Sequence, residues 1–472
     1  MNKTIRIIYI SVFIVLCCVP LLIMPFVSSS GAVGKEDAAE MPSLTENGKV
    51  NENFGNEFDT WFTQQMPFRR EIITANNMLS SDMLGKSANG VISGLDGWLF
   101  SEETVDDYIG VMPSKRAIYN IAETLRIMQD YVSGHNAKFV FAAAPDKNSI
   151  YPEYMPNGYV RSDENTLTKL EGYLEEYGVN YVSLKNELEM QKEKGQQVYL
   201  KCDTHWNNLG ALYGYNAIMN SLGNEHETFS GTDYSTRNDW YGDISKMLYP
   251  SAPKSCMQYY FDVDLTGIRF LQPRSQLAND ELMEELMSDK EQQDTVIRTM
   301  NAKGKGSLYI SRDSFGRAML PFLTSNYRSA YITRYRSFNL TDIDVKHYDD
   351  VIYEVVERNL TTVTDNAPMI YAPEVEQVSG NTIKSDEKNI IESKKDGNGI
   401  RIYGLLDESL IGDKSRIYIS IKDKGNESFY EAFPICETEL LGLSEKSDYG
   451  FSALIENVPT SVKTEDISVI IK

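Results

Sequence analysis

A histidine that could act as a general base follows an aspartate in the stretch "YLKCDTHWNNLG". The chain contains four histidines, and His205 stands two positions after Asp203, directly behind a strand that we predict over Gln197–Lys201. In an extended segment residues i and i+2 point to the same side, so the Asp203 carboxylate can reach the His205 ring. A carboxylate there fixes the imidazole tautomer and stabilises the imidazolium, as a general base requires. The alternative is an aspartate that caps the helix expected from about Asn207, beside an incidental histidine.

A serine in "SLYISRDSFGRAMLPFL" offers a nucleophile. Ser314 lies just past an apolar strand predicted over Ser307–Ser311 and just before a helix predicted from Phe315. Its backbone N–H would then lie at a helix N-terminus, ready to stabilise an oxyanion. The first glycine of a G-x-S-x-G turn is missing, although Gly316 is present. A purely structural helix cap at Asp313 or Ser314 is the alternative.

The elements around these residues alternate between helices and strands. Helical periodicity extends over Pro113–Gly134, and the apolar run Lys138–Pro145 is typical of a buried parallel strand. Further predicted elements are helices at Thr166–Tyr177, Lys185–Lys194 and Asn208–Gly223, and strands at Asn180–Leu184, Ser329–Arg334 and Asp350–Val356. This alternation predicts an α/β domain with a mostly parallel sheet, whose ligands bind beyond the carboxyl ends of the strands.

The last hundred residues have a different pattern. From about Pro373, short alternating segments such as "IRIYGLL" and "SRIYISIK" are separated by Asp, Gly, Ser and Asn, which predicts a small antiparallel β-sandwich. A packing cap and a sugar-binding module are both open as its role. We therefore expect a catalytic domain over residues 52–365 and an accessory β-sandwich over residues 373–472.

The N-terminal sequence is typical of a membrane-spanning or secretion segment. Lys3 and Arg6 precede Ile7–Val27, a stretch of 21 residues without a charge. That is about the length that spans a bilayer, and the basic flank keeps the N-terminus in the cytoplasm. We expect a signal anchor over residues 1–30, with a cleaved signal peptide as the alternative, and an extracytoplasmic tether over residues 31–51. Everything after about Ser30 would then lie outside the cytoplasm.

The net charge, the cysteines and the histidine spacing limit the classes of protein to which the chain can belong. The net charge of −22 argues against nucleic acid as a partner and suits an ectodomain that handles a neutral substrate. A Cys202–Cys256 bridge is conceivable, and unpaired thiols are equally open. A metal hydrolase with Asp203 and His205 as ligands is a second possible class. The other histidines show neither H-x-H nor H-E-x-x-H spacing, so we predict no metal.

The motifs resemble a known family. "DTHWNNLGALYGY" and "RDSFG", preceded by "GLDGWLF" and "APDKNSIYPEYMP", are similar to the SGNH-hydrolase-like proteins of the alginate O-acetyltransferase (AlgX/AlgJ-like) group and to surface proteins with a D-H-H-W motif. Thr204 stands where that motif has its first histidine. The resemblance covers roughly residues 51–359 and implies an SGNH-like (flavodoxin-like) three-layer domain. It also implies Ser314 as nucleophile, His205 as base and Asp203 as its orienting acid, in inverted order relative to ordinary SGNH hydrolases.

The resemblance also implies an activity. The family transfers acetyl groups to extracellular polysaccharides or removes them, needs no cofactor, and commonly receives its acetyl group from a membrane-bound O-acyltransferase. Three functions stay open: an O-acetyltransferase with an acetyl-serine intermediate, an O-acetyl esterase with the same triad, and a non-catalytic carbohydrate-binding or scaffold protein. Beyond the triad, Trp206 could stack on a sugar ring, Asn148 could donate a second oxyanion hydrogen bond, and Arg358 could hold a substrate.

Overall fold

The computed structural model describes residues 3–24, 26, 39–46, 48–83, 86–271, 296–334, 338–341, 348–436, 441, 445–458 and 463–472. Parts of the predicted N-terminal segment and tether (residues 1–2, 25, 27–38 and 47) therefore lie outside the described residues.

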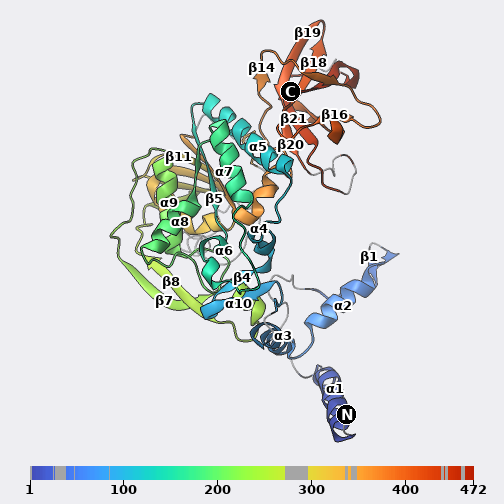
Figure 1. Ribbon diagram of the computed structural model, residues 1–472, viewed down its shortest axis with the longest axis vertical. Helices are drawn as coiled ribbons and strands as arrows, with labels where there is room; N and C mark the ends of the chain where they lie inside the picture. The colour runs from blue at the N-terminus through green and yellow to red at the C-terminus, as the bar shows by residue number, and fades with distance from the viewer. Residues whose placement is uncertain are drawn as a thin grey trace.

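A central mixed sheet organises the larger part of the molecule (Figure 1). In the described ranges its seven strands are, in spatial order, β6 (Tyr181–Val182), β5 (Lys138–Ala144), β13 (Asp350–Val356), β11 (Lys305–Ser311), β12 (Tyr327–Thr333), β10 (Ile297–Asn301) and β9 (Ile268–Leu271). The first five run parallel, and β10 is antiparallel to both of its neighbours, β12 and β9. The strands predicted over residues 138–145, 307–311, 329–334 and 350–356 are confirmed.

Side chains of β5 alternate between two hydrophobic cores, one on each face of the sheet. Val140, Ala142 and Ala144 pack in the core that includes α8 and α9, whereas Phe139 and Phe141 pack in the core that includes α5 and α7. The bounds of these helices are α5 (Lys115–Gly134), α7 (Thr166–Tyr177), α8 (Leu184–Glu193) and α9 (Asn208–Ser221), close to the predicted ones. The continuous apolar run of this strand therefore reflects burial on both faces.

The strand predicted over Gln197–Lys201 is wrong. These residues form a loop with an isolated bridge between Tyr199 and Trp206. Val198 N–H donates to the Tyr151 hydroxyl at 2.9 Å, so side chains instead of a neighbouring strand satisfy part of this backbone. Val198, Tyr199 and Leu200 are nevertheless buried, and burial alone produces an apolar run that periodicity cannot distinguish from a strand.

Two antiparallel sheets pack together at the C-terminal end, with a shared core of mainly isoleucine, valine and alanine side chains. One contains β14 (Glu374–Val375), β19 (Asn426–Glu431), β18 (Ile417–Asp423), β22 (Ile467–Ile471) and β15 (Asn381–Ile383); the other contains β16 (Ile390–Asp396), β17 (Gly399–Leu405), β21 (Gly450–Glu456) and β20 (Phe433–Ile435). This unit contacts α5, where Arg126 pairs with Glu431 at 2.6 Å and Asn120 donates to the Asp448 carbonyl at 2.9 Å. Figure 1 shows the orange and red strands beyond α5.

The remaining elements complete the described chain. They are α1 (Lys3–Ile23), β1 (Thr45–Glu46), β2 (Lys49–Val50), α2 (Phe54–Gln64), α3 (Arg69–Met78), β3 (Val91–Ser93), β4 (Leu99–Ser101), α4 (Val105–Tyr108), α6 (Lys147–Ile150), β7 (Tyr234–Tyr241), α10 (Asp243–Leu248), β8 (Ser255–Phe261) and α12 (Leu320–Asn326), with a π-turn at Leu79–Met83 and 3₁₀ turns at Leu95–Gly97, Glu102–Thr104, Pro152–Tyr154, Phe315–Met319, Glu357–Thr364, Glu408–Leu410 and Thr464–Asp466. Among the described residues, none of the helices meets the length and apolarity needed to span a bilayer.

Candidate active site

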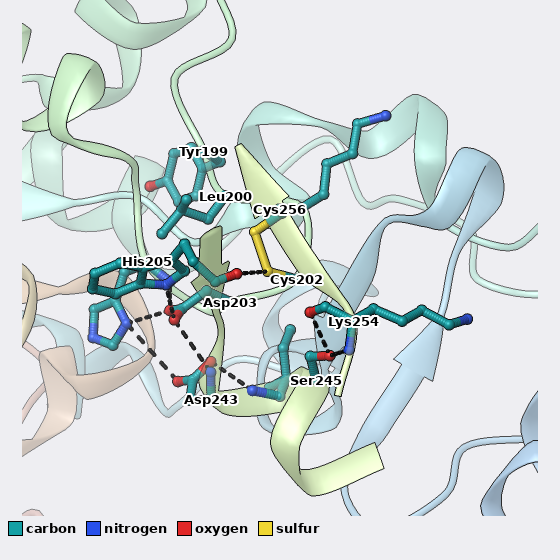
Figure 2. Close-up of a disulfide and its surroundings, with 12 residues drawn as sticks. Tyr199, Leu200, Cys202, Asp203, His205, Asp243, Ser245, Lys254 and Cys256 are labelled. Carbon is teal, nitrogen blue, oxygen red and sulfur yellow. Dashed lines mark hydrogen bonds and ion pairs between the residues drawn. A yellow bond between two sulfur atoms is a disulfide. The ribbon is translucent and has the colours of Figure 1, made fainter. Parts of the chain in front are cut away.

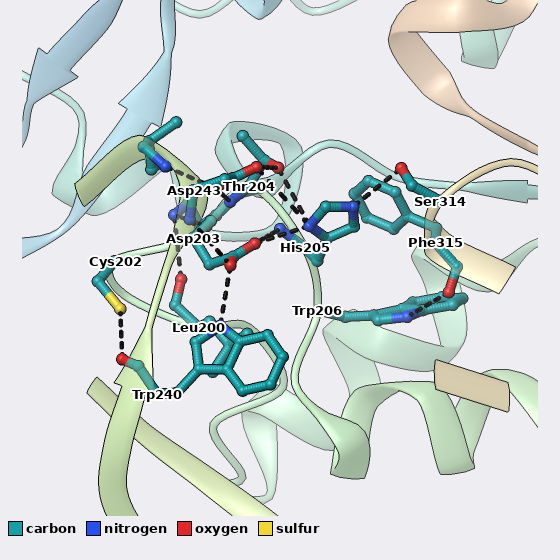
Figure 3. A network of polar contacts seen from close by, with 12 residues as sticks. Leu200, Cys202, Asp203, Thr204, His205, Trp206, Trp240, Asp243, Ser314 and Phe315 are labelled. Carbon is teal, nitrogen blue, oxygen red and sulfur yellow. Dashed lines mark hydrogen bonds and ion pairs between the residues drawn. The ribbon is translucent and has the colours of Figure 1, made fainter. Parts of the chain in front are cut away.

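Ser314, His205 and Asp203 form a hydrogen-bonded line (Figure 3). The Ser314 hydroxyl lies 2.9 Å from Nε2 of His205, and Nδ1 of the same ring lies 2.7 Å from Oδ1 of Asp203. The His205 side chain is 16% exposed and that of Asp203 only 3%, so the line runs from a half-open serine to a buried acid. The structure therefore brings together the three residues that the two sequence motifs predicted, although 109 positions separate the histidine from the serine.

A tight turn presents the histidine. The Leu200 N–H donates to the His205 carbonyl at 3.3 Å, and the His205 N–H donates to Oδ1 of Asp203 at 3.0 Å. The side chain of Asp203 thus bonds both the backbone and the ring of the residue two positions later. The i, i+2 geometry that was predicted for a strand is supplied by this turn instead.

The second oxygen of Asp203 is held by residues about forty positions downstream. The Trp240 indole N–H donates to Asp203 Oδ2 at 2.8 Å, and the Asp243 backbone N–H donates to the same oxygen at 3.2 Å. Gly242 between them has no room for a side chain, because an added Cβ would lie 2.1 Å from the Cys202 carbonyl oxygen. The carboxylate therefore accepts hydrogen bonds at both oxygens and is fixed relative to the imidazole.

Opposite effects set the pKa values of this pair. Burial disfavours the charged Asp203, but the charge of His205 and the hydrogen bonds from the ring, the His205 backbone and Trp240 outweigh it, and the pKa of Asp203 is lowered from its ordinary value. Burial also disfavours the imidazolium, yet the Asp203 carboxylate outweighs this and the pKa of His205 is raised above 6.5. Asp203 therefore stays ionised and stabilises a proton on His205, as an orienting acid should.

A second carboxylate approaches the histidine. Asp243 Oδ2 lies 3.8 Å from His205 Nδ1 and accepts a hydrogen bond from the Thr204 hydroxyl at 2.5 Å. Burial and the neighbouring Asp203 charge raise the pKa of Asp243. One donor atom from each of Asp203, His205 and Asp243 lies within 4.8 Å of the others, which is compatible with a cation. His205 Nδ1 is already hydrogen-bonded to Asp203 Oδ1, so a cation at these three groups would have to displace that hydrogen bond.

The nucleophile lies where β11 passes into the 3₁₀ turn Phe315–Met319. The Phe315 N–H donates to Asp313 Oδ1 at 2.8 Å, which makes Asp313 the local cap. The Ser314 N–H, in contrast, donates to no group in the described part of the chain. This free donor can bind an oxyanion that forms on a carbonyl carbon attacked by the Ser314 hydroxyl.

A pocket with about 610 Å³ of empty space opens at Ser314 and His205. The remaining walls are mostly apolar and aromatic and are formed by Leu200, Trp206, Trp240, Tyr260, Phe315 and Ala318. The polar side chains in these walls are those of Asn208, Gln258 and Arg317. Trp240, Gln258 and Tyr260 come from the β7–β8 ribbon (residues 234–261), which therefore forms one side of the pocket. Aromatic faces beside amide groups suit a sugar ring.

The three additional predicted residues take different positions. Trp206 contributes to the pocket wall but is 1% exposed, and its indole N–H donates to the Phe315 carbonyl at 3.0 Å. Asn148 is also 1% exposed, and its amide donates to Thr104. Arg358 pairs with Asp146 at 2.5 Å and lies over the Phe315 ring. The structure thus shows a packing contact for each of them, and their part in binding stays a prediction.

A disulfide ties the histidine turn to the β7–β8 ribbon. Cys202, directly before Asp203, is bonded to Cys256 on β8, as Figure 2 shows. The Ser245 N–H donates to the Cys202 carbonyl at 3.1 Å and adds a backbone contact at the same point. The bridge that the cysteine spacing left open is therefore present, and it joins the segments that supply Asp203 and Trp240.

A buried lysine secures the same turn. Lys147 is 4% exposed, and its ammonium donates to the carbonyls of Asp203, Leu200 and Lys201 at 2.5, 3.0 and 3.3 Å. Burial lowers the pKa of Lys147 to about 7. Sequence reasoning missed this residue, Trp240 and Asp243. The cysteine pair was the one signal that connected residues 202–206 to the ribbon.

Comparisons with known proteins cover part of the chain. Residues 91–286 match the family model described as SGNH hydrolase-like domain, acetyltransferase AlgX. Probable alginate O-acetylase AlgJ from Azotobacter vinelandii is 27% identical over 215 residues, which are 45% of this chain and 51% of that protein. AlgJ from Pseudomonas aeruginosa is 27% identical over 179 residues, 38% of this chain and 43% of that protein. The chain spans about half the length of the curated relatives it matches.

The comparison with solved structures gives matches at lower identity. A DHHW family protein from Eubacterium siraeum is 19% identical with a TM-score of 0.45, and it covers 59% of this chain and 94% of its own. The O-acetyltransferase domain of Pseudomonas putida AlgJ is 17% identical with a TM-score of 0.38, covering 58% and 92%. The family-model match includes Asp203 and His205 and ends before Ser314. The predicted resemblance is confirmed: residues 91–286 match the SGNH hydrolase-like acetyltransferase model, and the chain is similar to proteins named probable alginate O-acetylase AlgJ.

Proposed function

We propose that this protein is an extracytoplasmic, membrane-anchored serine O-acyltransferase that acetylates a cell-surface or secreted polysaccharide through an acetyl-serine intermediate. The observation that carries the proposal is the position of His205, whose two ring nitrogens lie 2.9 Å from the Ser314 hydroxyl and 2.7 Å from Asp203. A serine, a base and an orienting acid in this order are the parts that acyl transfer requires. The similarity to proteins named probable alginate O-acetylase supports the acetyl group as the group transferred.

The first half-reaction loads the serine. His205 Nε2 accepts the proton as the Ser314 oxygen attacks the acetyl carbonyl carbon of the donor. The new oxyanion accepts a hydrogen bond from the free Ser314 N–H. When this tetrahedral intermediate collapses, the bond to the donor breaks, the leaving group takes the proton from His205, and the acetyl group stays on Ser314.

The second half-reaction transfers the acetyl group from Ser314 to the acceptor. A sugar hydroxyl gives its proton to His205 Nε2 and attacks the acetyl-serine carbonyl, and collapse returns that proton to Ser314 as the sugar ester leaves. Throughout both halves Asp203 remains a carboxylate that stabilises the imidazolium. The aromatic and amide side chains of the β7–β8 ribbon would orient the acceptor sugar above Ser314.

An O-acetyl esterase with the same triad is the second candidate. In that case water would replace the sugar hydroxyl in the second half-reaction. The observation that favours it is the exposure of the His205 side chain, which at 16% gives water access to the base. A non-catalytic scaffold is less well supported, because such a protein has no need for hydrogen bonds that align a serine, an imidazole and an ionised carboxylate.

Location and partners follow from the same proposal. A disulfide next to Asp203 is typical of proteins that fold in an oxidising compartment, which supports a site outside the cytoplasm. The apolar segment within residues 7–27 would anchor the protein in the cell membrane. A membrane-bound O-acyltransferase would then be the partner that brings the acetyl group across.

The test is covalent loading of Ser314. After a short incubation of the protein with an aryl acetate, mass spectrometry is expected to show an acetyl group on Ser314, with Ser314→Ala and His205→Ala both inactive. Ser325→Ala is the matched control, because Ser325 hydrogen-bonds the Phe322 carbonyl away from the pocket. Partition of the acetyl group between water and an added oligosaccharide separates the transferase from the esterase. Wild-type rates in both triad variants would remove the proposal.

A further inference from the structure

A buried glutamate lies beneath the turn that carries the nucleophile. Glu354 on β13 has 0% exposure, and its Oε2 accepts hydrogen bonds from the N–H groups of Asp313 and Gly316, both at 3.1 Å. These two N–H groups lie on either side of Ser314. One carboxyl oxygen therefore fixes the backbone before and after the nucleophile, a role that neither sequence motif indicates.

The fit between the glutamate and the turn leaves no spare room. A Cβ added to Gly316 would lie 2.7 Å from Glu354 Oε2 and 2.7 Å from the Arg312 Cβ. Glycine is thus required where the carboxyl group meets the backbone. The Asp313 side chain extends the arrangement, because its Oδ2 accepts the Val356 N–H at 2.7 Å while Oδ1 accepts the Phe315 N–H. The two carboxyl groups together connect the nucleophile turn to the end of β13.

We propose that Glu354 is a positioning residue that sets the place of Ser314 through hydrogen bonds on both sides of the nucleophile. It does so through one carboxyl oxygen, Oε2, which accepts both hydrogen bonds. Its surroundings disfavour a charge, because the Glu354 Oε1 atom finds no hydrogen-bond partner among the described residues. The charged groups that face it are Asp313 and Arg312 from the turn, and the residue paired with it on β5 is Ala142. Burial and the Asp313 charge raise the pKa of Glu354 well above its ordinary value.

Three substitutions of Glu354 separate the effect of where the accepting oxygen lies from the effect of a charge on the side chain. Glu354→Gln keeps an accepting oxygen at the same place and carries no charge, so kcat for an aryl acetate should stay close to the wild-type value. Glu354→Asp keeps the acid but retracts its oxygens by about 1.5 Å, one C–C bond length. Since a displacement of this size at a reacting group can cost about a hundredfold in rate, kcat of Glu354→Asp should fall by up to that factor with KM little changed. Glu354→Leu should behave like Glu354→Asp or worse.

Asp350→Asn is the matched control. Asp350 is a buried acid on the same strand, 3% exposed and hydrogen-bonded to Tyr327 and Asn224. It lies four residues, about 13 Å, from Glu354 at the other end of β13. We expect this variant to lower the melting temperature without changing kcat, whereas Glu354→Asp lowers kcat even where its melting temperature matches that of the control.

The proposed role of Glu354 rests on the proposed function, and different results would contradict each of them. A wild-type protein that neither cleaves the aryl acetate nor reacts at Ser314 with a sulfonyl fluoride would contradict the proposed function. If the wild type does both and Glu354→Asp matches its kcat, the role of Glu354 is wrong and the triad stands. A Glu354→Gln variant as slow as Glu354→Asp would also overturn the role, because an accepting oxygen in the right place would then not be enough to position Ser314.

Discussion

The indole N–H of Trp240 donates a 2.8 Å hydrogen bond to Asp203, on the carboxylate oxygen that does not face His205. The same indole forms a wall of the pocket at Ser314. One side chain of the β7–β8 ribbon therefore contacts both the acid that orients the base and the space that receives a substrate.

Removing this donor should slow catalysis while leaving the pocket wall in place. Trp240→Phe keeps an aromatic ring but leaves one oxygen of a buried carboxylate with a single hydrogen bond. Hydrogen bonds to charged groups contribute about 1.5–3 kcal/mol, so we expect kcat to fall by about tenfold or more in steady-state assays with an aryl acetate. Tyr260→Phe is the control, because its hydroxyl donates to Asp239 and its loss leaves the hydrogen bonds of Asp203 unchanged. Equal kcat values in the two variants would show that the indole N–H does not matter.

The disulfide should contribute both stability and order at the site. The bridge closes a loop with a sequence separation of 54, for which chain entropy predicts a stabilisation of about 4 kcal/mol. A Cys202→Ser/Cys256→Ser double variant should therefore melt at a lower temperature by calorimetry and lose activity in parallel. A reductant should have the same effect on the wild type.

Cys436→Ser supplies the control for the reductant. Cys436 is a free, buried thiol that contacts Asp365, far along the chain from the histidine turn. The variant should respond to reductant as the wild type does. Retained melting temperature in the reduced wild type would contradict a stabilising role for the bridge.

The pH dependence of the rate should reflect the carboxylates around His205. The histidine accepts a proton only when neutral, so activity is lost as the pH falls through its pKa, which is raised above 6.5. Asp243→Asn removes a negative group 3.8 Å from Nδ1, which disfavours the imidazolium and lowers the pKa. The acid limb of kcat/KM should therefore move to lower pH, by about one unit. Asp239→Asn, an acid of the ribbon that binds Tyr260 instead, should leave the limb in place.

The buried ammonium of Lys147 should be needed for the histidine turn. Lys147→Met fills a similar volume but withdraws three donors from the carbonyls of residues 200, 201 and 203. Buried acceptors left without partners cost about 1–3 kcal/mol each, so both the free energy of unfolding and kcat should fall. Urea unfolding and aryl-acetate assays measure the two effects.

Lys201→Met is the corresponding control on the same turn. The Lys201 ammonium donates at 3.4 Å to the Asp96 carbonyl and makes no contact with the triad. The Lys201→Met variant should unfold at nearly the wild-type urea concentration and keep its kcat. If Lys147→Met is as stable and as active as this control, the buried ammonium does not secure the turn.

The triad was predictable because its signals are local. Asp203 and His205 are two positions apart, and Ser314 follows a buried strand, so two short motifs were enough to identify the three residues. The carboxyl-edge rule of parallel sheets holds for Ser314 alone, because residues 197–201 form a loop. Glu354, Lys147, Trp240 and Asp243 act through contacts that arise only when distant segments meet. A lysine or glutamate in an otherwise apolar run gives no sign of which backbone groups it will bind.

The strand predicted over residues 197–201 shows the same limit. Its side chains are buried as expected, but the tyrosine and lysine groups that satisfy the backbone come from residues 147 and 151. An apolar run reports burial and does not report which partner takes its hydrogen bonds.

The β7–β8 ribbon has a consequence for how such a protein can change its substrate. The ribbon supplies a wall of the pocket, a hydrogen-bond donor to Asp203 and one half of the disulfide next to that acid. A substitution in the ribbon that adapts the pocket to a different acceptor sugar therefore also changes the surroundings of Asp203. Mutations here that improve the fit of a different sugar would also alter the basicity of His205. In a selection for altered acceptors, we therefore expect productive changes to gather outside the ribbon, at positions such as Ala318, and the ribbon to stay constant.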